Sequence, residues 1–372
     1  MATDVSTGRT TWTGLLVVGF FLLASASRGQ ESNLVLPSAE KLLREAYART
    51  KAAPREADLT EIIRMCRQAR RAEPSKEVAA YADQLAAWAH NRRGEQYAQQ
   101  AVDLAGQDQQ AKVDELDAQA LADFEAAVQL DPKNWKALHN RGVSRALAGQ
   151  LDDALKDFSG VVERKPDYAN AWFNRGEVRA DRSEHAQAVA DYTQAIQLRP
   201  EDRDAHVRRG QAYLQLGKLR EALADYDRAV QLAPDEVELL LDRGDVHRSL
   251  GQWQLAAEDY RRAVALDHRS SQAYQRAAWI LATCPVDRYR NADLAVQAAE
   301  KALELDDEQD VKYLDTVAAA YASAGQFEKA CETLAQAIDA APAEAETFRR
   351  RLALYQRQEP YREPQPRGTA AP

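Results

Sequence analysis

The chain has 372 residues, of which 29% are charged, 45% hydrophobic and 7% aromatic, and its formal net charge is −9. A negatively charged chain repels phosphate backbones, so this balance argues against nucleic acid as a partner. The six histidines follow no metal-ligand spacing, and the sequence contains no HExxH, GxSxG, phosphate-binding glycine loop or paired cysteine motif. We therefore expect a protein that is not an enzyme and that uses no metal or cofactor.

Residues 1–26 have the pattern of a secretory signal peptide. An apolar core of ten residues, 14–23, is followed by small residues with the A-x-A spacing of a cleavage site ending at Ala26. The core is too short to cross a bilayer. We expect cleavage near Ala26, a linker over 27–36, and a periplasmic or secreted protein without an integral membrane span. A membrane anchor formed by an uncleaved N-terminal segment is the alternative.

Residues 37–134 are predicted to form helices whose sequence diverges from the regular pattern that follows them. The apolar pattern predicts one helix over 39–50 and another over 59–71, where Cys66 is expected to be a small buried hydrophobic residue. A second helix pair follows, but about fourteen residues are inserted within 105–119 relative to the later spacing. This insertion either loops out or lengthens both helices.

Residues 135–344 show a 34-residue period. Four Arg-Gly pairs recur at this interval, and a small residue, an aromatic residue and a helix breaker return in the same register. The recurring residues are Gly142, Gly176, Gly210 and Gly244; Ala154, Ala188, Ala222 and Ala256; Phe158, Tyr192, Tyr226 and Tyr260; and Pro166, Pro200 and Pro234, with His268 in the fourth proline slot. A constant period of this length predicts a stack of helical units.

The unit at 169–202 illustrates the predicted hairpin. Its first helix covers about 170–181 and its second about 185–198, with Gly176 at the closest approach and Ala188 opposite it. Pro200 cannot continue the second helix because it lacks a backbone N–H. Two antiparallel helices are therefore expected in each unit.

These residues resemble the tetratricopeptide repeat (TPR) family, whose consensus positions 4, 8, 20, 24, 27 and 32 are occupied here by Trp172, Gly176, Ala188, Tyr192, Ala195 and Pro200. The resemblance implies an all-α, right-handed superhelical solenoid of helix hairpins. Its units are expected at 135–168, 169–202, 203–236, 237–270, 271–310 and 311–344, followed by a capping helix over 345–358 and a disordered tail over 359–372.

Two departures from the TPR consensus stand out. Arg145 and Arg179 occupy position 11, where an aromatic residue is usual. The interval from Ala263 to Ala302 is 39 residues, where the repeat spacing is 34. Five extra residues therefore lie around Cys284-Pro285 in the unit at 271–310, which predicts a lengthened turn between its helices.

An arginine at position 7 recurs together with an aspartate at position 23 of the same unit. We expect ion pairs across each hairpin, because Arg–carboxylate pairs of this kind commonly fix packing. The expected structural pairs are Arg141 with Asp157, Arg175 with Asp191, Arg209 with Asp225, and Arg243 with Asp259, preceded by Arg93 with Asp123.

The resemblance places the binding surface of TPR proteins on the concave face of the first helices. The corresponding peptide-groove residues are Asn140, Phe173, Asn174, Glu177, Arg208, Gln211, Asp242, Asp245, Arg276 and Trp279. The polar members at position 6 suit an extended peptide backbone, and Phe173 and Trp279 suit apolar anchoring. Alternatively, these residues are ordinary solvent-compatible positions on a helix face.

Carboxylate-clamp TPR domains need a cation where this chain has Asp204, so capture of a free C-terminal carboxylate is not expected. Two functions remain. The first is an extracytoplasmic scaffold or adaptor that binds a protein or extended peptide in the concave groove. The second is a structural assembly protein that associates through convex faces or array ends. The sequence does not identify the partner or the oligomeric state.

Overall fold

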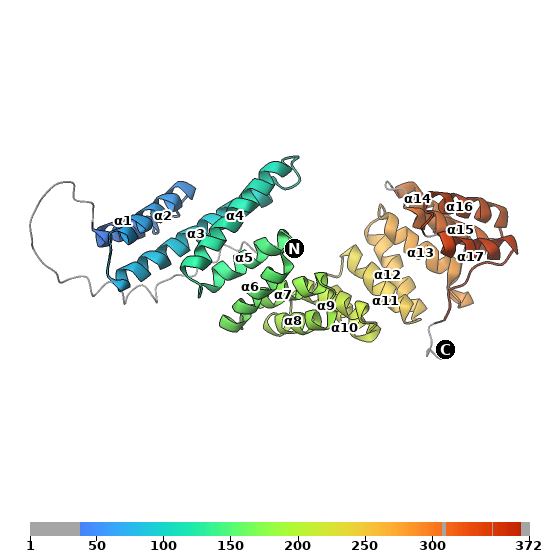
Figure 1. Ribbon diagram of the computed structural model, residues 1–372. Coiled ribbons are helices and arrows are strands. Elements are labelled where there is room, and N and C mark those ends of the chain that lie inside the picture. The colour runs from blue at the N-terminus through green and yellow to red at the C-terminus, as the bar shows by residue number, and fades with distance from the viewer. Residues whose placement is uncertain (1–37, 307–309, 344, 366–372) are drawn as a thin grey trace, which may run out of the picture. The chain divides into compact units, whose positions relative to one another are not determined.

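The structure is a computed structural model that describes residues 38–306, 310–343 and 345–365. Residues 1–37, which include the expected signal peptide and the whole of the expected linker, lie outside the described residues. Within the described residues every regular element is a helix, so this part of the chain is all-α, as predicted (Figure 1). No described helix has the length and apolar composition needed to cross a membrane.

The chain divides into two compact units, one ending at Val178 and the other beginning at Arg179. The first contains α1 (Ala39–Arg49), α2 (Glu56–Arg71), α3 (Lys76–Leu104), α4 (Gln110–Leu130), α5 (Trp135–Leu147), α6 (Leu151–Arg164) and most of α7 (Ala169–Asp181). The second contains the end of α7, α8 (His185–Leu198), α9 (Arg203–Gln215), α10 (Leu219–Leu232), α11 (Val237–Ser249), α12 (Trp253–Leu266), α13 (Ser271–Thr283), η1 (Asp287–Tyr289), α14 (Ala292–Leu305), α15 (Val311–Ser323), α16 (Phe327–Ala340) and α17 (Ala345–Gln356).

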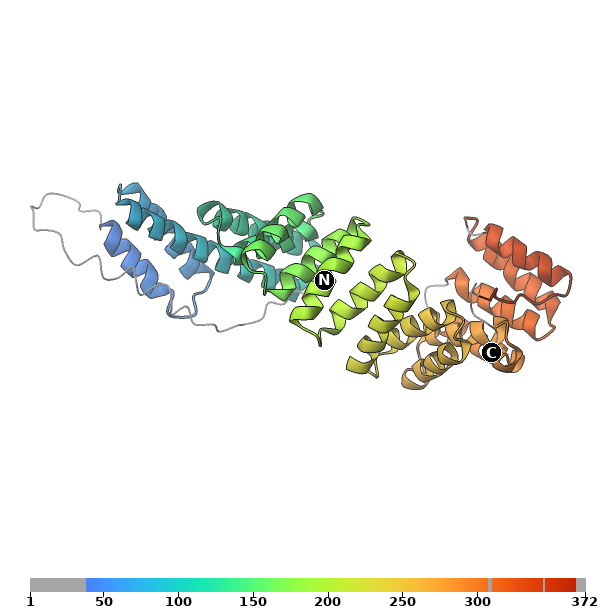
Figure 2. The same cartoon turned by 90° about the horizontal axis from the view of Figure 1, so that it is seen from below.

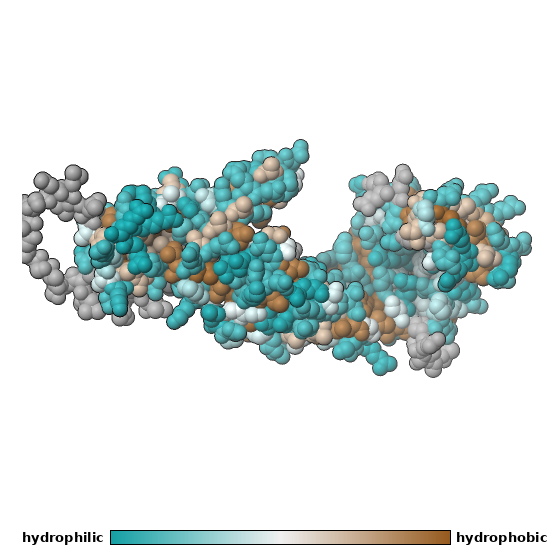
Figure 3. All heavy atoms as spheres, viewed as in Figure 1, coloured by the Kyte–Doolittle hydropathy of each residue, from teal (hydrophilic) through white to brown (hydrophobic). Residues whose placement is uncertain are grey.

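Consecutive helices within each unit pack as hairpins, such as α5 with α6 and α11 with α12 (Figure 2). Their facing sides form the core, whereas hydrophilic residues cover much of the face drawn in Figure 3. The inserted residues before the regular repeats lengthen both α3 and α4, which leave only a short turn between them. Ala101 and Leu116 are buried in these extra turns, so the added helix has a packed side.

The aromatic ring at position 24 sets the closest approach within a hairpin. A Cβ atom added to Gly244 would lie 2.5 Å from Cε1 of Tyr260, and one on Gly142 would lie 2.9 Å from Cε1 of Phe158. At Gly142, Gly210 and Gly244 the nearest side chain is the aromatic ring, because the large side chain reaches across to the helix that lacks one. The predicted approach of Ala188 to Gly176 joins the two compact units and stays a prediction.

A left-handed residue ends most of the first helices. Gly149 has a φ of 74°, and the N–H of Gln150 donates to the carbonyl of Arg145 at 2.8 Å. In the long unit Pro285 occupies the equivalent position, and its ring fixes φ at a negative value. The chain therefore cannot make the same turn, and η1 supplies the lengthened connection to α14.

The last described residues return toward α13. Helix α17 packs on α16 and buries Phe348 and Tyr355, as expected for a cap. It ends in a turn at Gln358, whose φ is 60° and whose N–H donates to the carbonyl of Tyr355. Composition predicts disorder over 359–372, but residues 361–363 contact Trp279, Ala282 and Thr283 of α13. Composition does not reveal these contacts, because the partners belong to another helix. Residues 366–372 lie outside the described part.

Substitution of the glycine at the hairpin contact should destabilise the fold. We expect Gly244→Ala to lower the free energy of unfolding by about 1–3 kcal/mol, because the new methyl group meets the ring of Tyr260. Gly160→Ala is the control: only the mobile tip of Arg164 lies within 3.4 Å, so helix propensity should raise stability by up to about 1 kcal/mol. Urea unfolding of both variants measures the difference, and a shift in the same direction for both would contradict the steric explanation.

Candidate functional site

The recurrent arginines and aspartates meet inside the hairpins. Arg141 binds Asp157, Arg209 binds Asp225 and Arg243 binds Asp259, with shortest N–O distances of 2.6, 2.7 and 2.6 Å. Arg93 binds Asp123 in the same way at 2.7 Å. Each of these guanidinium groups donates two hydrogen bonds to one buried carboxylate. Arg175 lies in the first compact unit and Asp191 in the second, so that pair stays a prediction.

The two arginines that depart from the consensus act on the same aspartates. Nη1 of Arg145 donates to Asp157 at 2.9 Å, and Nη1 of Arg179 donates to Asp191 at 2.7 Å. At Asp157 the departure adds a second cation to a buried carboxylate, and at Asp191 it supplies a cation to one. The ion pairs of Arg145 and Arg179 were not predicted. Both repeats that have an arginine at position 11 also have an aspartate at position 23, and that pattern could have indicated them.

Hydrogen bonding outweighs burial in setting the charge state of these pairs. The hydrogen bonds to Asp225 and Asp259 raise the pKa values of Arg209 and Arg243, respectively, although burial opposes the effect. Burial raises the pKa of Asp123, but the hydrogen bonds from Arg93 and His90 lower it more, so the net shift is downward. The Asp123 carboxylate and the Arg209 and Arg243 guanidinium groups are therefore held in the charged form.

In the first compact unit, each position-6 side chain binds the first helix of the hairpin before it. Nδ2 of Asn140 lies 3.1 Å from both Oδ1 of Asn91 and Oε1 of Glu95, on α3. Nδ2 of Asn174 lies 3.1 Å from Nε2 of His139, on α5. Both amide groups therefore have hydrogen-bond partners within the chain itself. Phe173 and Glu177 are half-buried on α7.

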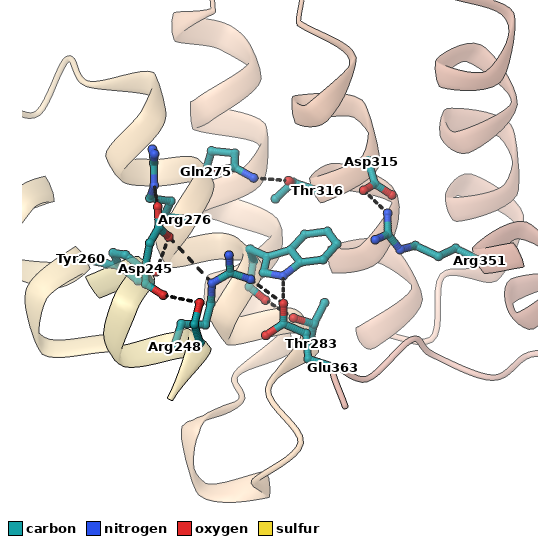
Figure 4. A network of polar contacts seen from close by, with 12 residues as sticks. Asp245, Arg248, Tyr260, Gln275, Arg276, Thr283, Asp315, Thr316, Arg351 and Glu363 are labelled. Carbon is teal, nitrogen blue, oxygen red and sulfur yellow. Dashed lines mark hydrogen bonds and ion pairs between the residues drawn. The ribbon is translucent and has the colours of Figure 1, made fainter. Parts of the chain in front are cut away.

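In the second unit, the expected groove residues form a connected network. Nε of Arg276 donates to Oδ2 of Asp245 at 2.8 Å, and the phenol of Tyr260 donates to Oδ1 at 2.7 Å (Figure 4). Burial and the nearby charge of Asp245 raise the pKa of Asp242. Arg208 donates to Gln211 on α9, 3.2 Å away. The network thus links α11, α12 and α13.

A recess of about 420 Å³ lies beside this network. Side chains of α11, α12, α13, α15 and α17 line it, together with Asp310 just before α15. Trp279, Arg276 and Asp245 belong to both the recess and the sequence-predicted groove. The sequence analysis did not assign the contribution of α17, where Arg351 pairs with Asp315 of α15. No spacing signal pointed to Arg351, because the capping helix lies outside the repeat register.

The described residues contain no cluster of three or more His, Cys, Asp or Glu side chains able to hold a metal ion. The three cysteines are free thiols. Cys66 is buried on α2, where burial raises the pKa of its thiol to about 12. That thiol therefore stays protonated near neutral pH and lacks the character of a nucleophile.

Removal of one member of a buried Arg–Asp pair should cost more than removal of both. We expect Arg243→Met to lower the free energy of unfolding by about 3 kcal/mol, because the Asp259 carboxylate is left buried and uncompensated. Adding Asp259→Leu should restore part of the loss. The exposed pair of Lys156 and Asp153 is the control and should show a coupling energy below about 1 kcal/mol. Equal coupling in the two double-mutant cycles, measured by urea unfolding, would contradict this role for burial.

Comparisons with known proteins support the repeat assignment. Family models described as tetratricopeptide repeat match residues 118–169, 147–203 and 173–237, then 210–279, then 311–344. Together these matches cover more than half of the chain. No curated protein matches it.

Solved structures of helical proteins are similar to this chain at low identity. YrrB, described as a TPR protein with an unusual peptide-binding site, is 24% identical over 54% of this chain and 97% of its own, with a TM-score of 0.43. A tetratricopeptide repeat protein from Parabacteroides merdae is 18% identical over 71% of this chain and 98% of its own, with a TM-score of 0.48. Pseudomonas aeruginosa pilF is 15% identical over 60% of this chain and 96% of its own, with a TM-score of 0.48.

The family matches and the helix hairpins lead to one assignment. The chain belongs to the tetratricopeptide repeat family.

Proposed function

We propose that this protein is an extracytoplasmic, non-catalytic scaffold or adaptor that binds a protein or extended peptide on the concave face of its first helices. The observation that carries the proposal is the recess of about 420 Å³ in the second unit. Its walls come chiefly from α11, α13 and α15, the first helices of three successive hairpins. A surface built from equivalent helices suits a ligand that runs across several repeats.

The chemistry of the recess favours a peptide. Gln272 and Lys312 are exposed at its wall and offer hydrogen-bond donors, whereas Trp279 offers a large ring. Asp310 and Asp245 add acceptors of negative charge. A peptide presents backbone groups and side chains of all these kinds, so it can satisfy a lining of mixed polarity.

The extracytoplasmic location is part of the proposal and is supported by the apolar core and small residues within 1–26. The mass of the N-terminal peptide of the protein recovered from cells distinguishes cleavage near Ala26 from retention of an uncleaved anchor. Recovery of residues 1–26 on protein from the cytoplasmic fraction would contradict both.

Charge changes in the recess should disrupt partner binding. We expect Gln272→Glu/Lys312→Glu to weaken partner recovery at least about tenfold, because the double change reverses the charge of an exposed wall with little effect on packing. The measurement is quantitative affinity capture from an extracytoplasmic fraction, followed by titration of each identified partner after purification.

The matched control is Gln297→Glu/Lys301→Glu on α14, which makes the same charge change on the second helix of a hairpin. This control should leave recovery unchanged. Loss of partners in the control alone would favour assembly through the other face of the array, and unchanged recovery in both variants would rule out the recess as the binding surface.

A further inference from the structure

The chain places a segment of its own in the concave face of the second unit. Oε1 of Glu363 accepts hydrogen bonds from Nη1 of Arg248 at 2.5 Å and from Nε1 of Trp279 at 2.8 Å (Figure 4). Burial lowers the pKa of Arg248, but the charge of Glu363 and other neighbours raises it overall. The carboxylate therefore occupies a charged and directional site that links α11 to α13.

A backbone N–H and a guanidinium group of the same segment bind the end of α13. The N–H of Glu363 donates to the carbonyl of Thr283 at 2.8 Å, and Nη1 of Arg362 donates to the carbonyl of Ala282 at 2.9 Å. The last carbonyls of a helix have no partner inside it. In this unit Pro285 has no N–H and cannot adopt the left-handed turn that ends the neighbouring first helices, so these carbonyls remain open to another chain segment.

An aromatic side chain completes the contact. The ring centroid of Tyr361 lies 6.1 Å from that of Trp279. The guanidinium carbon of Arg351 lies 5.0 Å from the Trp279 ring and 4.8 Å from the Tyr361 ring, so α17 supplies a cation to both. Cation–π contacts of this kind are stronger when partly shielded from water, and Tyr361 is half-buried.

We propose that this surface is a binding site for an extended peptide with an aromatic residue followed two positions later by a carboxylate, and that residues 361–363 are an internal copy of that ligand. This proposal rests on the proposed function and names the chemistry of the partner. The ligand is a segment of a partner protein, which takes the place of residues 359–365. The site recognises three separate features: the ring, the carboxylate and the backbone N–H of the acidic residue.

The recess explains how an external segment displaces the internal one. Arg248, Trp279 and Arg351 bound the recess and also contact residues 361–363, so the two sites adjoin. The internal segment leaves the recess beside it open. An external ligand that continues into it gains contacts with groups such as Gln272 and Lys312 that the internal copy lacks.

Tethering sets the balance between the two. The internal segment follows α17 after only four residues and therefore acts at an effective concentration on the order of millimolar. A short external peptide with the same contacts and nothing more is at a disadvantage. Emptying the site by substitution should thus increase the apparent affinity for such a peptide.

The test uses the full chain and a fluorescent synthetic peptide with the sequence of residues 359–365. In the variant Tyr361→Ala/Glu363→Ala the site is empty, and we expect the peptide to bind at least about tenfold more tightly than to the unchanged protein, measured by anisotropy. Arg248→Gln in the emptied background should reverse the gain, whereas Arg261→Gln, an exposed position on α12, should not. A peptide with alanine at both recognition positions should bind at least about tenfold more weakly.

Hydrogen exchange gives a second measurement that does not depend on the peptide. The Glu363 amide should be protected in the unchanged protein and should lose protection in Glu363→Gln, whereas circular dichroism should show the same helix content. An unprotected amide in the unchanged protein, or equal peptide affinity before and after the site is emptied, would overturn the proposal. If the emptied site fails to bind while Gln272→Glu/Lys312→Glu still abolishes partner capture, this inference alone fails. If both tests are negative, the proposed function fails as well.

Discussion

The close approach of the two helices in a hairpin is the constraint on which the binding surface depends. Tyr260 lies against Gly244, and the neighbouring residue Asp259 receives two hydrogen bonds from Arg243. Adjacent positions on one helix thus bind adjacent positions on the other, one by shape and one by charge. This arrangement commits one face of α11 to its hairpin partner, and the side chains that follow, Asp245 among them, are left to face the next first helix.

The period of the repeat was sufficient to predict the hairpins, because glycine, aromatic and proline side chains each have a strong local effect on packing. The contact of the Tyr260 ring with Gly244 was not predicted, since sequence spacing alone does not show how far the ring reaches. The outcome at 105–119 was also left open. Its one glycine, Gly106, lies in the short turn between the helices, and tertiary contacts such as the burial of Leu116 favour longer helices over a loop.

The sequence predicted which helix face the groove residues share, but it did not predict the hydrogen-bond partners of their side chains. Register placed Asn140 and Asn174 on the first helices, yet in the structure each amide binds the first helix of the hairpin before it. First helices lie side by side, so the position that faces a ligand in register also faces a neighbour. The contacts to an extended chain come instead from positions further along the helix, where Arg248 and Trp279 project.

Pro285 links the lengthened turn of the repeat at 271–310 to the binding of residues 362 and 363. Where the other hairpins turn through a left-handed residue, Pro285 prevents this turn, and the Asn291 N–H returns to the carbonyl of Leu281 while the next two carbonyls receive donors from residues 362 and 363. An occupant that offers only a ring and a carboxylate would leave the Thr283 carbonyl without its donor. The site therefore selects a chain with a free backbone N–H at the acidic residue, which excludes small aromatic acids and favours an extended peptide.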